Sequence, residues 1–179
     1  MTKNLEHWQY PIGRYLPKFN FEKHEIEAAI TTLKDFPEQL RSTLSAYSPE
    51  DLNAPYRPGG WKIKQLVHHI ADSHCHAYMR CKYAYLENNP TIKVYRENDW
   101  AEKSPDALGC DIEASLKVIE GFHRRWTYFL KQLTAEELKR EFSHPERKEH
   151  FTIAEMAYFY AWHARHHLAH IVNYKNFSS

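Results

Sequence analysis

The chain has 179 residues, of which 42% are hydrophobic and 15% aromatic, and its 24 lysines and arginines balance 23 aspartates and glutamates. This length is typical of one folded unit, so we expect a single domain spanning residues 1–179. The formal net charge of +1 argues against a nucleic acid or an anionic membrane as the main partner, and no run of about 18 apolar residues predicts a membrane span.

The N-terminal half is predicted to hold an extended arm and two helices. Prolines and a glycine among the aromatic residues of segment 1–20 predict an extended arm rather than a helix. Apolar residues then recur at helical spacing over residues 23–47, where Pro37 is expected to kink or restart the helix. Prolines and a Gly-Gly pair predict a loop over 48–60, and a second long helix follows over 61–86.

A long connection and a third helix are predicted next. The polar, proline-containing segment 91–108 is the longest connection in the chain, and it is interpreted as a loop or lid. Apolar residues at threes and fours predict a helix over 111–133. The sequence Thr134-Ala135-Glu136-Glu137 has the form of a capping box that opens a short helical turn.

The last predicted element is a fourth long helix. Residues 143–151 are polar and contain a proline, which predicts another loop. A second capping box, Thr152-Ile153-Ala154-Glu155, starts the helix, which is expected to end near Val172 to Tyr174. Four long helices with almost no strand signal predict an all-α four-helix bundle with an extended N-terminal arm.

The last helix carries the most informative pattern in the chain, a pair of histidines four residues apart. His163 and His167 are offset by only about 40° around a helix, so both imidazoles can reach one ion. A third neutral imidazole completes a three-histidine site with an open position, in which a divalent metal activates a bound water or thiol. Helix 61–86 offers His68 and His69 for this place, and the helical pattern does not decide between them.

Other interpretations of the polar residues stay open. A histidine pair at this spacing also arises by chance as a solvated stripe, and His170 shares its face. Ala164 stands where metalloprotease helices carry a glutamate, which argues against a zincin-type peptidase. Asp72, three residues after His69, is either a surface acid or a group that accepts a proton from an imidazole or acts on bound water. His76 is a weaker candidate for the same pocket.

The cysteines and the N-terminus suggest a cellular compartment. Cys75, Cys81 and Cys110 are an odd number and lack the close spacing of a zinc ribbon, so we expect reduced thiols, the first two in the core. The N-terminus has no apolar stretch of signal-peptide length. We therefore expect a soluble, cytoplasmic protein.

At these residues the chain resembles the DinB/YfiT superfamily of four-helix metal proteins, and within it the YfiT-type proteins described as metal-dependent hydrolases or bacillithiol S-transferases. The resemblance covers nearly the whole chain. It implies an up-down-down-up bundle, often a homodimer, with zinc or nickel in the site. It is carried by the segments Tyr10–Tyr15, Pro58–Trp61, Val67–His74 and Trp162–His167.

Carried over by motif, the ligands that the resemblance implies are His69, His163 and His167, so it selects His69 over His68. It implies an enzyme whose divalent ion activates either a small thiol such as bacillithiol, which then attacks an electrophile, or water, with Asp72 as a candidate base. On the resemblance alone we favour thiol transfer. The alternative is a non-catalytic stress or sensor protein in which a bound metal or small ligand stabilises the bundle.

Overall fold

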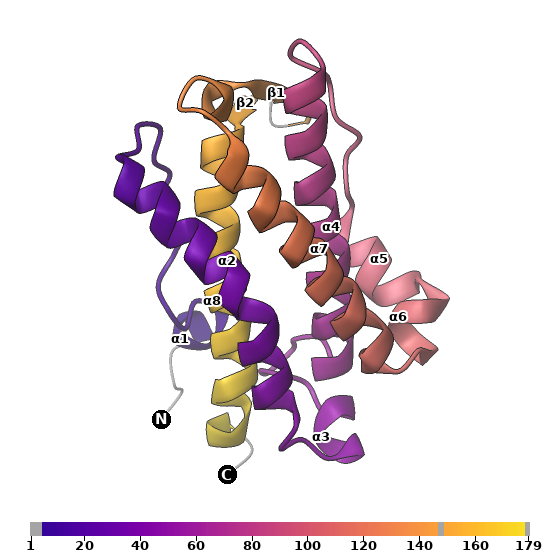
Figure 1. Cartoon of the computed structure of the whole chain (residues 1–179). Helices are drawn as coiled ribbons and strands as arrows, with labels where there is room; N and C mark the ends of the chain where they lie inside the picture. The colour runs from indigo at the N-terminus through magenta and orange to yellow at the C-terminus, as the bar shows by residue number, and fades with distance from the viewer. Residues whose placement is uncertain (1–4, 147–148, 178–179) are drawn as a thin grey trace.

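The computed structural model describes residues 5–146 and 149–177. Four long helices build it, and α2 and α8 run in one direction while α4 and α7 run in the other (Figure 1). This arrangement confirms the predicted up-down-down-up four-helix bundle. Each observed helix begins and ends within about three residues of its prediction. The four are α2 (Lys23–Leu44), α4 (Ile63–Leu86), α7 (Ile112–Gln132) and α8 (Ile153–Phe177).

Neighbouring helices α4 and α7 run in the same direction, so the chain must return along the bundle between them (Figure 1). The return contains two short helices, α5 (Glu97–Lys103) and α6 (Pro105–Gly109), where the sequence predicted only a loop. A buried hydrogen bond from Gln65 Nε2 to the Ala101 carbonyl, 2.7 Å long, fastens α5 to α4. Segment 91–108 is thus ordered and packs against α4.

Two further predictions about short segments were wrong, and the extended N-terminal arm also contains a short helix that was not predicted. The N-terminal arm begins with a helix, α1 (Leu5–Gln9), which ends before Pro11, and the loop 48–60 contains α3 (Pro49–Asn53), capped by Ser48. Segment 143–151 is largely a hairpin of strands β1 (Glu141–His144) and β2 (Glu149–Thr152) rather than a loop. Strand β1 also pairs with the chain around Ile92, a contact between residues about fifty positions apart.

Helix starts were predicted more accurately than interruptions. Thr134 and Glu137 exchange the hydrogen bonds of a capping box ahead of a 3-10 turn, η1 (Glu137–Lys139), and Thr152 and Glu155 do the same at the start of α8. Pro37 lies inside α2 without restarting it, because the helix is held on both sides of the proline by buried apolar residues.

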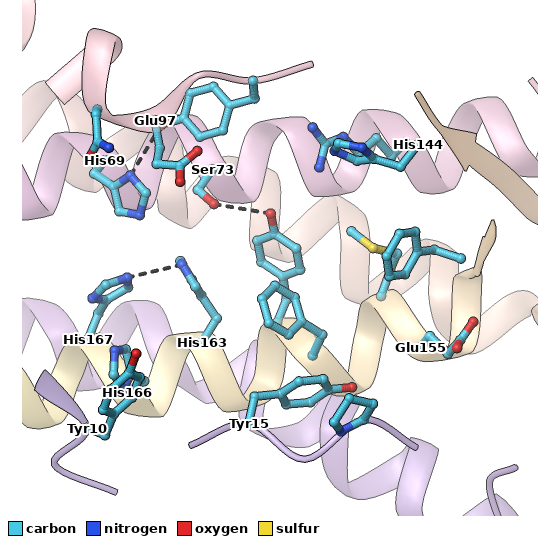
Figure 2. Close-up of a pocket in the computed structure, with 18 of the residues that line it drawn as sticks. Tyr10, Tyr15, His69, Ser73, Glu97, His144, Glu155, His163, His166 and His167 are labelled. Atoms are coloured by element: carbon cyan, nitrogen blue, oxygen red, sulfur yellow. Dashed lines mark hydrogen bonds between the residues drawn. The ribbon is translucent and has the colours of Figure 1, made fainter. Parts of the chain in front are cut away.

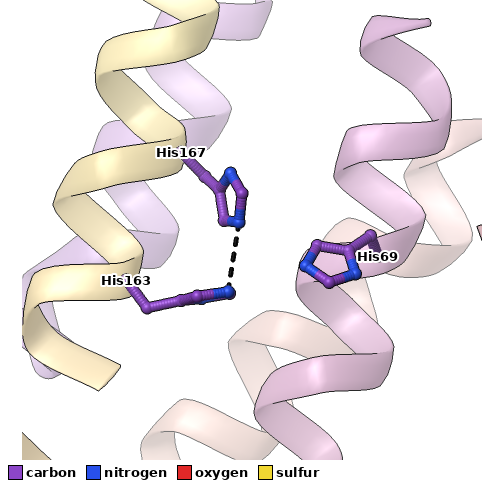
Figure 3. A group of neighbouring side chains, drawn as sticks. All are labelled: His69, His163 and His167. Atoms are coloured by element: carbon purple, nitrogen blue, oxygen red, sulfur yellow. Dashed lines mark hydrogen bonds between the residues drawn. The ribbon is translucent and has the colours of Figure 1, made fainter. Parts of the chain in front are cut away.

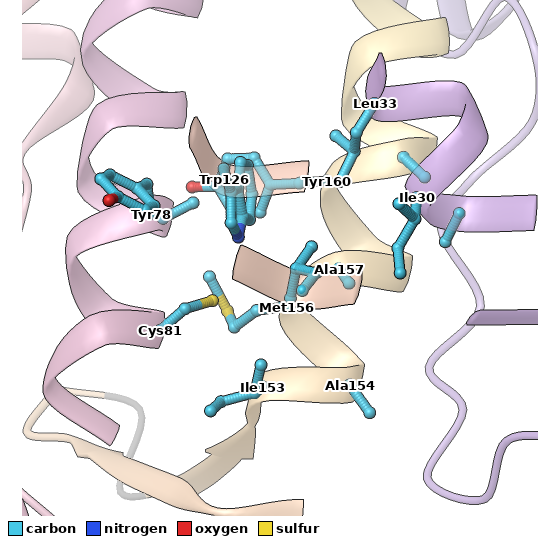
Figure 4. Packing of buried hydrophobic residues seen from close by; sticks show 14 of the residues in the cluster. Ile30, Leu33, Tyr78, Cys81, Trp126, Ile153, Ala154, Met156, Ala157 and Tyr160 are labelled. Atoms are coloured by element: carbon cyan, nitrogen blue, oxygen red, sulfur yellow. The ribbon is translucent and has the colours of Figure 1, made fainter. Parts of the chain in front are cut away.

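The apolar core forms two clusters that follow one another along the bundle. The first contains Trp126, Met156 and Tyr160, with Cys81 buried among them (Figure 4). The second contains Phe36 and the apolar residues of α4 up to Ala71. On α4, α7 and α8 the boundary between the clusters falls at buried histidines. No helix in the described part of the chain has the length and apolar character needed to cross a membrane.

Candidate metal centre

Three buried histidines from two helices converge at the boundary between the core clusters (Figure 3). His69 lies on α4, and His163 and His167 lie one turn apart on α8; their exposed fractions are 6%, 9% and 8%. One ring nitrogen from each lies within 4.8 Å of the others. The Nε2 atoms of His163 and His167 are 3.1 Å apart. The structure thus brings together His163 and His167, which the helical spacing indicated, and His69, which the family resemblance selected.

The adjacent histidines of α4 differ in what they contact. His68 Nδ1 lies 2.7 Å from the Ser115 hydroxyl, and its Nε2 lies 3.3 Å from the Cys110 carbonyl oxygen. It therefore faces α7, about 100° around the helix from its neighbour. His69 faces α8, and its Nδ1 lies 3.3 Å from the hydroxyl of Tyr95.

A chain of hydrogen bonds fixes the protonation of His163. The Leu33 carbonyl only accepts, so His123 Nδ1, 2.5 Å away, carries a proton and donates it. His123 Nε2 is then an acceptor for His74 Nδ1 at 2.7 Å, and His74 Nε2 accepts from His163 Nδ1 at 3.0 Å. With neutral rings throughout, His163 Nε2 is left as a bare lone pair that faces His167.

A second chain does the same for His167. His170 Nε2 lies 3.1 Å from the Trp8 carbonyl and 3.2 Å from the Gln9 carbonyl, at the end of α1, so it must be the protonated nitrogen. His170 Nδ1 then accepts from His167 Nδ1 at 3.4 Å. His167 Nε2 is consequently unprotonated, like that of His163.

Two lone pairs that face each other at 3.1 Å repel unless a cation lies between them. Burial lowers the pKa of His163 and His167 far below the ordinary value, so a proton is a poor candidate for that cation. Two nitrogens bound to one tetrahedral zinc ion at about 2.0 to 2.1 Å lie roughly 3.3 Å apart. The donor set therefore fits a divalent metal, and both ligands have the orienting hydrogen bonds that metal-bound histidines require.

The histidines open onto a large cavity between α4, α8 and the N-terminal arm (Figure 2). Its volume is about 1000 Å³, and its walls are rich in aromatic rings. Ser73 and Tyr160, whose hydroxyl oxygens are 3.1 Å apart, line the wall next to the histidines. Such a cavity holds a molecule of substrate size with one end at the imidazole nitrogens.

Asp72, His76 and Cys75 lie off this cavity, whereas His170 lines it. Asp72 is half-buried on α4 and is not among the residues that line it; burial, together with the charge of Asp106, raises its pKa to about 6. This placement offers no support for Asp72 as a base acting in the cavity. His76 stacks on Tyr95 with ring centroids 4.5 Å apart and also lies outside the lining. Cys75 is half-buried rather than a core thiol.

Sequence reasoning missed several residues that complete the site. His74 and His123 were not recognised as partners of His163, because they lie 89 and 40 positions away from it along the chain. Glu97 was part of the presumed loop, yet it lines the cavity on the side of His69 (Figure 2). The signal available was the run of histidines on α4, one turn and more beyond His69, which a purely apolar stripe does not explain.

Comparison with known proteins places the chain in a family. The model of the DinB superfamily matches residues 32–171. A Bacillus subtilis protein named "Putative metal-dependent hydrolase YfiT" is 39% identical over 162 residues, which cover 90% of each chain. A "Putative metal-dependent hydrolase" of Bacillus cereus is 41% identical over 165 residues, 92% of this chain and 94% of that one.

A solved structure shares the fold. It is described as "YfiT from Bacillus subtilis is a probable metal-dependent hydrolase with an unusual four-helix bundle topology", and it superposes with a TM-score of 0.91 and 37% identity. The match covers 95% of this chain and 97% of that one. The chain belongs to the DinB superfamily.

Proposed function

We propose that this member of the DinB superfamily is a cytoplasmic metal-dependent enzyme that joins a small thiol to an electrophile at a centre held by His69, His163 and His167. The observation that carries the proposal is the pair of unprotonated nitrogens, 3.1 Å apart, that two hydrogen-bond chains aim at one point beside a cavity of about 1000 Å³. A zinc or nickel ion bound there supplies Lewis acidity, which lowers the pKa of a coordinated thiol or water.

The protein's own residues have definite tasks in this reaction. His74 and His170 hold the ligand rings in one tautomer, so that the donor atoms face inward before any substrate binds. The aromatic cavity wall orients the substrate. No cysteine lines the cavity in the described part of the chain, so the sulfur nucleophile must arrive with the substrate. The thiol gives its proton to water and becomes a thiolate, its sulfur bonds to the electrophilic carbon, and the leaving group departs with the electrons of the bond that breaks.

Hydrolysis is the second candidate, and two observations favour it. The relatives carry the name "Putative metal-dependent hydrolase". Glu97 presents a carboxylate to the cavity on the side of His69, where a base for a bound water is needed (Figure 2). Glu97 therefore replaces Asp72 as the candidate base of a hydrolase. The two reactions share the site and differ in the nucleophile.

A conjugation assay tests the proposal. Purified protein is mixed with monochlorobimane and with bacillithiol, cysteine or glutathione, with and without added Zn²⁺ or Ni²⁺, and the fluorescent conjugate is measured. We expect conjugation that depends on added metal and is lost in His163→Ala. Conjugation no faster than the uncatalysed rate with every thiol removes the transferase proposal. Cleavage of an ester or amide panel that is lost in Glu97→Gln would establish the hydrolase instead.

A further inference from the structure

Three side chains with permanent positive charge line the cavity, and one of them has no partner among the residues that the structure describes. Lys18 is hydrogen-bonded to Glu25. Arg57 donates to the Tyr56 hydroxyl at 3.2 Å and to the Pro58 carbonyl at 3.1 Å. The Arg80 side chain makes no hydrogen bond or ion pair with any residue that the structure describes, and its Nε is shielded from solvent. A shielded donor without an acceptor costs roughly 1 to 3 kcal/mol, so this guanidinium is suited to an external acceptor.

The position of Arg80 places it at the far end of the cavity from the histidines. It follows His69 on α4 by eleven residues, which is three helical turns plus about 20°, so both side chains leave the same face. The two Cα atoms are separated by about 16 Å along the helix axis. Phe142 and His144 of β1 line that end, and Figure 2 shows His144 well beyond Ser73 along α4.

The carboxylates that line the cavity do not neutralise Arg80. Glu102 accepts a hydrogen bond from Trp61 Nε1 at 3.0 Å, and Glu155 caps the start of α8. No carboxylate oxygen of a described residue lies within 4.0 Å of the Arg80 guanidinium; the cavity acids Glu97 and Glu146 share the wall without reaching it. A guanidinium offers a planar fork of N–H groups that matches a carboxylate in a bidentate pair.

We propose that Arg80 forms a subsite for a carboxylate of the substrate, at the end of the molecule opposite the reacting sulfur. This inference rests on the proposed function, because it takes the sulfur to lie at the histidine centre. It also selects among thiols. Cysteine, whose sulfur and carboxylate are only a few bonds apart, is too short to occupy both places. Bacillithiol, which carries its malyl carboxylates at the end away from the thiol, is long enough.

Binding of thiol-blocked ligands tests the subsite without any reaction. The probes are S-methyl bacillithiol and its analogue without the malyl group, and dissociation constants are measured by calorimetry on the full-length, metal-loaded protein. We expect Arg80→Gln to weaken binding of S-methyl bacillithiol by about tenfold to a hundredfold, and to leave the analogue within twofold. Arg80→Lys should give an intermediate loss, because it keeps the charge and loses the fork.

Controls separate this subsite from a structural role and from the proposed reaction. Arg124→Gln, an exposed arginine of α7 outside the cavity, should leave both dissociation constants unchanged. Arg80→Gln should unfold at the same temperature as the unsubstituted protein or a higher one; a clear loss of stability would reveal an internal partner and overturn the inference. Equal affinity for the two probes, or equal weakening of both, also overturns it. A failure of thiol conjugation leaves these binding results intact, so the two proposals fail separately.

Discussion

Helix α8 carries two overlapping histidine pairs of the same spacing, and only one of them forms the candidate metal centre. His163 and His167 are four residues apart with ring centroids separated by 4.3 Å, and His166 and His170 repeat both values. The first pair lies opposite His69 of α4. The second lies opposite the last carbonyls of α1 and the ring of Tyr10. The local helix geometry is identical, so the opposing element decides the role.

The orienting hydrogen bonds show the same contrast. In His163 and His167, one ring nitrogen is hydrogen-bonded to a buried imidazole and the other faces a shared point. His170 Nε2 donates a hydrogen bond to backbone carbonyls, and His166 Nδ1 is buried without a hydrogen-bond partner among the described residues. Nitrogens of His166, His167 and His170 also approach within 4.8 Å, yet that group has no second chain to set its protonation. Proximity of imidazoles is therefore less informative than the network behind them.

The difference between the two histidine pairs is tested most directly by removing one member of each. His163→Ala should abolish stoichiometric binding of Zn²⁺ or Ni²⁺, because two imidazoles from different helices hold the ion far more weakly than three. His166→Ala is the matched control and should retain it. Metal content after dialysis, measured by plasma mass spectrometry, decides the matter. Equal content in the two variants would contradict the assignment of the first pair.

The neutral state of the chain behind His163 is tested by acid. Burial lowers the pKa of His123 from 6.5 to about 4, so the folded state holds fewer protons than the unfolded state between these values. Its contribution to stability is present above pH 6.5, is lost as the pH falls and is gone below about pH 4; the shift corresponds to roughly 3 kcal/mol.

Urea unfolding of metal-free protein measures this loss. His123→Gln should depend less steeply on pH over the same window than the unsubstituted protein. Parallel curves for the two proteins would show that His123 is not held neutral.

The chain behind His167 is tested by His170→Phe, which keeps an aromatic ring against Tyr56 and removes the acceptor for His167 Nδ1. Loss of such an orienting partner lowers metal affinity by about 10- to 100-fold. Competition with a chelator measures the affinity, and ¹⁵N shifts of the imidazoles report the tautomer of His167. His76→Phe, outside the cavity, is the control. An affinity unchanged in His170→Phe would mean that helix geometry alone orients the ligand.

The contrast between local helix geometry and contacts with distant segments also explains which features the sequence could predict. The four long helices were predictable because each carries its own apolar repeat and its own caps, as at Thr152 and Glu155. Helices α5 and α6 and the hairpin were not, because their stability comes from distant contacts such as Gln65 with Ala101 and Phe142 with the core. The spacing of His163 and His167 could be read locally, whereas the choice of His69 needed either the family resemblance or the fold.

The smallest effect on turnover is expected for a substitution of Asp72 on α4, where closeness to a ligand along the helix again does not mean a role in the site. Asp72 follows His69 by three residues, yet it lies off the cavity near Asp106, which helps raise its pKa to about 6. Asp72→Asn should therefore change turnover by less than about threefold, whereas loss of a general base typically costs a hundredfold or more. Because the folded pKa lies above the ordinary 3.8, the carboxyl group favours folding below about pH 4, and this contribution is lost as the pH rises through 6. Asp72→Asn should consequently be more stable than the unsubstituted protein at pH 8 and equal to it at pH 4 in thermal unfolding. A hundredfold fall in turnover would instead restore Asp72 as the base and show that an acid outside the cavity wall in this conformation reaches the centre during the reaction.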